Sequence, residues 1–167
     1  MMKILAATDF SEESKPVLDF TANMVKQCGG KMYLLHAVEP CMIDAAGSLP
    51  TDDNMLGFIP PVGIPDERLN ECKCLLERAD ARAKHLAATI SREWDVPIYG
   101  KAEEADDIVE CVHNFCKRHD IDILVIGNRH HTLLSSILLG NTAEKLVRAA
   151  TIPVTVVPCG NKAKATK

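Results

Sequence analysis

The densest group of side chains able to bind a ligand lies between Gly127 and Glu144, in the stretch GNRHHTLLSSILLGNTAE. An apolar run, IDILVI (121–126), precedes this stretch, and a helical pattern follows it. Asn141 is a favoured helix N-cap residue, and Glu144 three residues later makes a pattern similar to a capping box. The first N–H groups of a helix point outward without partners and attract anions. A phosphate is therefore the ligand that this junction favours.

The glycines and basic side chains of the stretch would assist such a site. Gly127 lets the chain turn sharply off a strand, and Gly140 permits a close approach of ligand to backbone. Arg129, His130 and His131 are additional donors. The alternative is that the glycines only mark the end of a strand and the start of a helix, as in many α/β proteins. Neither GxxxxGK[ST] nor GxGxxG occurs, so the sequence indicates no P-loop and no dinucleotide fingerprint.

Length and composition restrict the class of protein. The chain has 167 residues, 47% of them hydrophobic, and a net charge of −4. We expect one domain, 1–160, followed by a disordered tail, 161–167. The acidic balance disfavours nucleic acid as a partner. The seven cysteines lack zinc-ribbon spacing and are expected to be reduced, which favours a cytoplasmic location. No signal peptide or membrane-spanning stretch is recognisable, so no membrane partner is expected.

Strands and helices are expected to alternate along the chain. The patterns predict strands at 3–8, 32–38, 96–100, 121–127 and 153–157, and helices at 11–28, 66–93, 105–119 and 141–150. The first helix is expected to bury Val17, Phe20, Thr21, Met24 and Cys28. Strands that are apolar on both faces are typical of a parallel α/β sheet covered by helices on both sides, whose ligands bind beyond the carboxyl ends of the strands. Segment 40–65, with its five prolines, is expected to be an irregular loop.

Three stretches, ILAATDFSEES, YLLHAVEP and ILVIGNRHHTLLSSILLGNTAEKLVRAATIPVTVVP, occur in an order that resembles the universal stress protein family. The resemblance covers nearly the whole chain. It implies a Rossmann-like α/β fold with a five-stranded parallel sheet of order 3-2-1-4-5. It also implies a homodimer that pairs through the strand at 153–157, and binding of ATP or AMP, with or without Mg²⁺.

The resemblance also assigns residues to the nucleotide site. Nucleotide-binding members carry a glycine, two residues, a glycine, nine residues, and a glycine followed by Ser or Thr. Gly127 and Gly140 match the outer glycines, whereas His130 replaces the middle glycine and Asn141 replaces the Ser or Thr. By the same resemblance, adenine and ribose would lie against the end of the first strand. The implied site comprises Ala7, Thr8, Asp9, Val38, Ile126, Gly127, Arg129, His130, Gly140, Asn141 and Thr142.

The sequence favours a binding or signalling module over an enzyme. It offers no recognisable general base beside the phosphates, so no catalytic residue is assigned and any ATP hydrolysis is expected to be slow. One alternative is a weak ATPase in which His130 or His131 orients water. A second is a nucleotide-free dimeric scaffold, which the bulk of His130 favours. Two adjacent histidines rarely share one metal ion, so no metal site is expected.

Two further residues have competing interpretations. Asp9 follows the first strand, as the phospho-acceptor of a receiver domain would, but the other carboxylates of such a site are not in place. A helix cap or a ribose contact is the preferred role. His36 lies mid-strand among apolar residues, and we interpret it as a core histidine with a satisfied hydrogen bond rather than as a ligand.

Overall fold

The computed structural model describes residues 1–40, 66–129 and 141–159, without the side chains of 66–72 and Arg129. The strands are β1 (Met2–Ala7), β2 (Gly30–Val38), β3 (Ile98–Glu104), β4 (Ile123–Arg129) and β5 (Val154–Cys159). The helices are the 3-10 helix η1 (Glu12–Ser14), α1 (Lys15–Cys28), α2 (Asp66–Trp94), α3 (Ile108–His119) and α4 (Asn141–Ala149). Every predicted strand and helix is present, with shifted ends. The predicted loop beyond Pro40 and the predicted tail lie outside the described residues.

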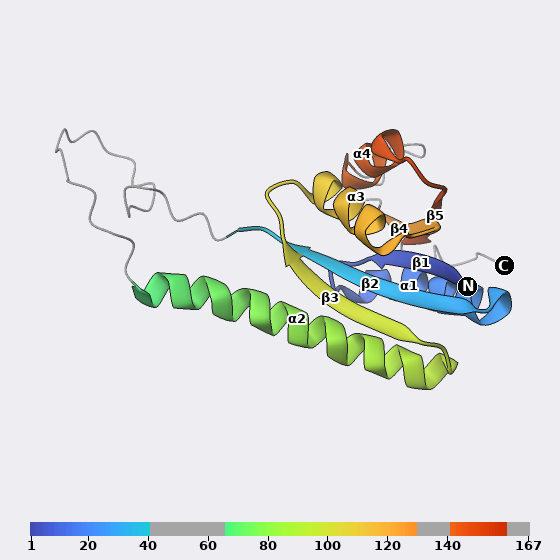
Figure 1. Ribbon diagram of the computed structural model, residues 1–167, viewed down its shortest axis with the longest axis horizontal. Coiled ribbons are helices and arrows are strands. Elements are labelled where there is room, and N and C mark those ends of the chain that lie inside the picture. The colour runs from blue at the N-terminus through green and yellow to red at the C-terminus, as the bar shows by residue number, and fades with distance from the viewer. Residues whose placement is uncertain (41–65, 130–140, 160–167) are drawn as a thin grey trace, which may run out of the picture.

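The five strands form one parallel sheet of order β3-β2-β1-β4-β5, as predicted (Figure 1). In the central pairings, Ala7 lies opposite Leu35, and Ile4 lies opposite Ile123. The carboxyl ends of β1 and β4 therefore lie side by side at the end of the sheet where the parallel strands terminate. Strand β4 continues to Arg129, so Gly127 lies within the strand and not at the point where the chain leaves it, which corrects the prediction.

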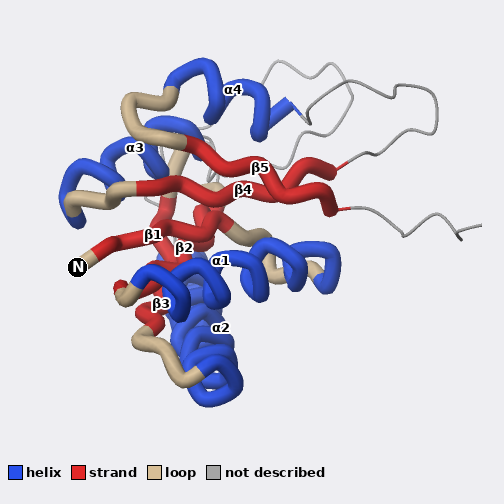
Figure 2. Tube along the Cα trace, turned by 90° about the vertical axis from the view of Figure 1, so that its right-hand side faces the viewer, coloured by secondary structure: helices blue, strands red, loops and turns tan. Residues whose placement is uncertain are grey.

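Helices cover both faces of the sheet, α1 and α2 on one and α3 and α4 on the other (Figure 2). Successive residues of β1 divide between the two layers, because side chains alternate along a strand. Ile4 and Ala6 pack with residues of α1 and α2, whereas Leu5 packs with residues of α3 and α4. This double burial explains the continuous apolar character of the strand.

The buried face of α1 differs from the prediction. The residues that it buries are Val17, Leu18, Thr21, Ala22 and Val25. Phe20 is 39% exposed, and Cys28 is exposed as well. Val17 and Thr21 are therefore buried as predicted, whereas the buried Leu18, Ala22 and Val25 were not part of the prediction.

The helix predicted at 11–28 is divided into the short helix η1 and the helix α1. Because α1 begins only at Lys15, Pro16 falls in its first turn, where the missing N–H costs no hydrogen bond. Gly29 ends α1 with a left-handed φ of 68°, a conformation that glycine adopts without strain.

Helix α2 covers the edge strand β3. A Cβ atom on Gly100 would lie 2.1 Å from the carbonyl oxygen of Ala83, so this close crossing requires glycine. Asp80 Oδ1 accepts the backbone N–H of Ala102 at 3.0 Å, which satisfies a donor on the edge strand. Asp80 also pairs with Lys84 (2.7 Å) and with Lys101 (3.3 Å).

The charged contacts of Asp80 change its protonation. Burial alone would raise the pKa of the Asp80 carboxyl, but the hydrogen bond from Lys84 opposes this effect. Together with the Ala102 N–H and Lys101, it lowers the pKa to about 2. Asp80 is therefore a charged anchor between α2 and β3.

Buried cysteines contribute to the core as small apolar side chains. Burial raises the pKa of the Cys116 thiol to about 11, and burial also raises the pKa of Cys111. Both thiols remain protonated at neutral pH and are poor nucleophiles. Within the described ranges, no helix combines the length and the apolar character needed to cross a membrane.

Candidate functional site

A cavity of about 410 Å³ lies at the carboxyl ends of the central strands. Its lining comes from β1 and the turn that follows it, from β2, β4 and β5, and from helices α1, α3 and α4. Parallel α/β sheets ordinarily bind ligands at these carboxyl ends of the strands. The cavity brings together seven of the predicted site residues: Ala7, Thr8, Asp9, Ile126, Gly127, Asn141 and Thr142.

The turn after β1 forms the polar wall of the cavity. Thr8 Oγ1 accepts the N–H of Phe10 at 3.0 Å. Asp9 Oδ1 accepts the N–H of Ser11 at 3.1 Å and the hydroxyl of Ser14 at 2.7 Å. Threonine and aspartate commonly bond to the backbone two residues ahead, which folds such a turn locally. Asp9 thus shapes the turn, while the N-cap residue of α1 is Ser14.

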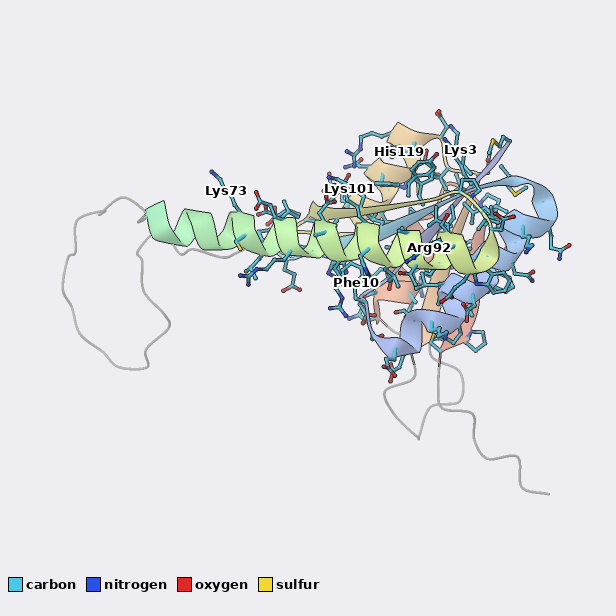
Figure 3. All side chains as sticks on the ribbon, turned by 90° about the horizontal axis from the view of Figure 1, so that it is seen from below. Lys3, Phe10, Lys73, Arg92, Lys101 and His119 are labelled. Carbon is cyan, nitrogen blue, oxygen red and sulfur yellow. The ribbon has the colours of Figure 1, made fainter. Side chains whose placement is uncertain are left out.

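Helix α2 braces this turn from outside. Phe10 has a left-handed φ of 61°, which is costly for a bulky residue and needs support from its surroundings. Arg82 Nη2 donates to the carbonyl of Phe10 at 3.0 Å, and its guanidinium lies 4.9 Å from the centre of the Phe10 ring. Figure 3 shows Phe10 beside α2. These contacts of Arg82 with Phe10 help to hold Asp9, the residue before Phe10, at the cavity.

Strand β2 contributes His36 and Ala37 to the cavity, but not Val38. The carbonyl of Val38 accepts the N–H of Ala105 at 2.9 Å, at the start of the connection to α3. The residue assigned to the site, Val38, is therefore adjacent in sequence to Ala37, which lines the cavity.

His36 has the satisfied hydrogen bond expected from the sequence. Its Nδ1 lies 2.8 Å from the carbonyl oxygen of Thr8, which can only accept, so Nδ1 carries the proton. The ring also stacks on Phe10, with 4.1 Å between the ring centres. His36 nevertheless lies on the cavity wall rather than deep in the core, a position that the apolar context of the sequence does not reveal.

The opposite wall combines a helix terminus with a glycine at a close contact. Helix α4 begins at Asn141, and its first residues line the cavity, so the N-terminal end of the helix faces the site. A Cβ atom on Gly127 would lie 2.8 Å from Cys159 Sγ and 3.2 Å from Val17 Cγ2. Gly127 therefore allows β4 to pass close to β5 and α1. This packing role accompanies any role in ligand binding.

Three predicted site residues have no described side-chain position. Arg129 is the last residue of β4 and lies opposite Cys159 in the register of β5, but its side chain is not described. His130 and Gly140 lie outside the described residues, as does His131. Their assignments stay predictions.

The remaining wall of the cavity is apolar. It comprises Leu35, Ala37, Ile108, Val112, Ile126, Ala143 and Leu146. The two α3 residues in this list were not recognised in the sequence as site residues, because their approach to the strand ends depends on the packing of α3. Among the described lining residues, Asp9 is the only one that carries a carboxylate, and none is a lysine or arginine. No group of three or more metal-ligating side chains occurs in the described part of the chain.

The match to a known family decides the identity of the fold. Residues 1–54 and 63–158 match the model of the Universal stress protein family. The chain belongs to the universal stress protein family. Universal stress protein MJ0531 of Methanocaldococcus jannaschii is 28% identical over 159 residues, which cover 93% of this chain and 81% of that protein.

Solved structures of universal stress proteins share the fold. The universal stress protein from Archaeoglobus fulgidus in complex with dAMP superimposes with a TM-score of 0.55 at 21% identity, over 93% of this chain and 97% of that one. A universal stress protein in complex with cAMP gives a TM-score of 0.59 at 14% identity, over 95% and 98% of the two chains. At these identities the likeness establishes the architecture, in agreement with the strand order seen here.

Proposed function

We propose that this universal stress protein binds an adenine nucleotide, ATP or AMP, in the cavity at the ends of β1 and β4. The main support for this proposal is that one cavity combines the carboxylate of Asp9, the N-terminus of α4 and an apolar wall. These three features suit a ribose, a phosphate and a planar base, respectively. The dAMP and cAMP complexes of the two family members support this ligand class.

The chemistry of each wall assigns a part of the nucleotide to it. The base would pack against the apolar side chains of β2, α3 and α4, such as Leu35 and Val112. The ribose would lie at Asp9, whose carboxylate accepts hydrogen bonds from hydroxyl groups. The phosphates would lie at the first N–H groups of α4, with Arg129, His130 and Gly140 nearby in sequence. A Mg²⁺ ion would take most of its ligands from the phosphates and water, as this ion commonly does.

The two edges of the sheet support the proposed homodimer through β5. The edge strand β3 is covered by α2, and Asp80 accepts the N–H of Ala102 on that strand. Strand β5 is the other edge of the sheet, and an edge strand readily pairs with a second chain. We propose the pairing at Val154–Cys159 on this basis. The cytoplasmic location inferred from the cysteines stays a prediction.

The two alternatives make different predictions about the same site. A weak ATPase would release phosphate from ATP at a rate that His130→Ala or His131→Ala lowers. A nucleotide-free scaffold would bind no nucleotide in its wild-type form, and His130→Gly, which restores the family motif, would create binding. The binding module is preferred because the sequence offers no recognisable general base beside the phosphates.

Two measurements test the proposal. Native mass spectrometry of freshly purified protein detects a retained nucleotide as added mass. Calorimetry with nucleotide-free protein then measures the affinities for ATP, AMP and adenosine, with GTP as the control for the base. We expect ATP and AMP to bind more tightly than adenosine, because phosphate adds the contact with α4. Absence of added mass, together with no heat of binding for any adenine compound, would refute the proposal.

A matched pair of variants locates the binding site. Gly140→Val adds bulk immediately before α4 and is expected to abolish ATP binding without unfolding the protein. Ala149→Val introduces the same valine side chain at an exposed position in the last turn of the same helix and is expected to bind ATP normally. Equal affinities in the two variants would place the nucleotide elsewhere.

A further inference from the structure

We propose that the hydroxyl of Ser14 positions the Asp9 carboxylate for a ribose hydroxyl, so that Ser14 sets the preference of the cavity for ribonucleotides over deoxynucleotides. The inference rests on the proposed binding of adenine nucleotides. Ser14 acts through Asp9 and is a positioning residue.

The first observation is that Ser14 does not cap its own helix. It occupies the N-cap position of α1, where serine ordinarily accepts an N–H group from the first helical turn. The side chain of Ser14 makes no such bond. Its Oγ lies instead 2.7 Å from Asp9 Oδ1, a separation typical of a hydroxyl that donates to a carboxylate. The hydroxyl is thus directed away from the helix and toward the cavity.

The second observation concerns burial and the number of donors. Ser14 is only 7% exposed, whereas Asp9 is exposed, and both line the cavity. The Ser11 N–H donates to the same oxygen of Asp9, at 3.1 Å. One backbone donor and one buried hydroxyl together restrict the rotation of this carboxylate. An acceptor ordered in advance binds its ligand with a smaller loss of conformational entropy.

The chemistry of the carboxylate determines what it selects. An ionised carboxylate only accepts hydrogen bonds, so it recognises the hydroxyl groups of ribose and not the ether oxygen of the ring. A site with a fixed acceptor discriminates strongly against an analogue that lacks the donor, because the acceptor then loses its partner. When the carboxylate rotates freely, this discrimination weakens. Ser14 should therefore affect ribonucleotides more than the matching deoxynucleotides.

The experiment measures three ligands against four proteins by calorimetry. The ligands are ATP, 2′-deoxy-ATP and 3′-deoxy-ATP, and the proteins are the wild type, Ser14→Ala, Ser14→Thr and Ser11→Ala. The Ser11→Ala variant is the matched control, because it removes a hydroxyl 3.3 Å from Ser14 Oγ but keeps the N–H that Asp9 accepts. Ser14→Thr keeps a hydroxyl at the critical position.

We expect Ser14→Ala to weaken ATP binding about tenfold, which corresponds to about 1.4 kcal/mol. The affinity for at least one of the two deoxy analogues should change by less than twofold, as expected when the lost contact is absent from the outset. Ser11→Ala should bind like the wild type, and Ser14→Thr should recover most of the ATP affinity. An equal loss for all three ligands, or no loss for ATP, would overturn the inference.

A second readout separates this inference from the proposed function. Three-bond NMR couplings of Asp9 in ligand-free protein report whether its χ1 angle is fixed. We expect one rotamer in the wild type and averaging in Ser14→Ala, and identical couplings would overturn the positioning role. If the wild type binds no adenine nucleotide, the proposed function and the ribose preference both fail. The couplings then still decide whether Ser14 orders Asp9.

Discussion

Replacing Asp80 with asparagine tests the anchor between α2 and β3. Asparagine retains an oxygen that can accept the Ala102 N–H, so the substitution removes the charge and keeps the shape. The ordinary pKa of 3.8 and the folded value of about 2 correspond to about 2 kcal/mol of stability at neutral pH. Lys84 and Lys101 are 65% and 50% exposed, so solvent screening reduces the expected loss to about 1 kcal/mol.

The sign of the pH dependence follows from the lowered pKa. Above pH 4 the carboxylate is charged in both the folded and the unfolded protein, and its full contribution is present. As pH falls below the unfolded value of 3.8 toward the folded value of about 2, the unfolded chain takes up a proton first, and the contribution is lost. The difference in stability between wild type and Asp80→Asn should therefore be constant from pH 7 to pH 5 and shrink below pH 4.

Urea denaturation followed by circular dichroism measures the difference. Glu144→Gln is the matched control, because Glu144 forms an i,i+4 pair with Arg148 on α4 and is itself 45% exposed. Such an exposed pair is expected to contribute about 0.5 kcal/mol or less. Two results would refute the reasoning: a loss in Asp80→Asn no larger than in the control, or a loss that persists unchanged at pH 3.

Three further predictions concern packing, assembly and the ligand. Gly100→Ala should destabilise the fold by about 2 to 3 kcal/mol through overpacking against Ala83, and an unchanged thermal midpoint would contradict the close crossing of α2. Val156→Lys should shift a dimer toward monomer in sedimentation; because Val156 is partly buried, circular dichroism must first show a folded variant. An anionic ligand should raise the pKa of His130, so ATP affinity should fall with rising pH more steeply in the wild type than in His130→Gly. Identical pH profiles from 5.5 to 8.5 would separate His130 from the phosphates.

The sequence predicted the elements of the fold well because most strands contain an apolar run bounded by turn residues; β3, with the sequence IYGKAEE, is the exception. It predicted the buried face of α1 less well. Thr21 is fully buried because its hydroxyl donates to the carbonyl of Val17 at 2.7 Å. This bond makes a polar residue acceptable in the core, while Phe20 remains partly exposed. The burial of Val17 and Thr21 was predicted correctly, whereas that of Leu18, Ala22 and Val25 was missed.

The candidate site was predicted where local sequence determines local structure. The resemblance to the family assigned Thr8 and Asp9 to the site, and both line the cavity. Asn141 was predicted to be the N-cap of its helix and is its first residue. Ala37 was missed because the resemblance pointed to Val38, its neighbour on β2. Ser14 was missed because a serine at an N-cap position gives no sign that its hydroxyl serves another residue.

The position of β5 links the two halves of the proposed function. Cys159, the last residue of β5, lines the cavity. Its side chain lies so close to Gly127 on β4 that a Cβ atom there would clash with it. If two chains pair through β5, their interface lies one strand away from the ends that would hold the phosphates. If nucleotide binding then changes the affinity of the two chains for each other, dimer formation must change the affinity for the nucleotide by the same factor, since linkage between binding events is reciprocal. Strand β5, through which we propose that two chains pair, contributes to the cavity lining, whereas β3, the opposite edge strand next to α2, contributes no lining residue.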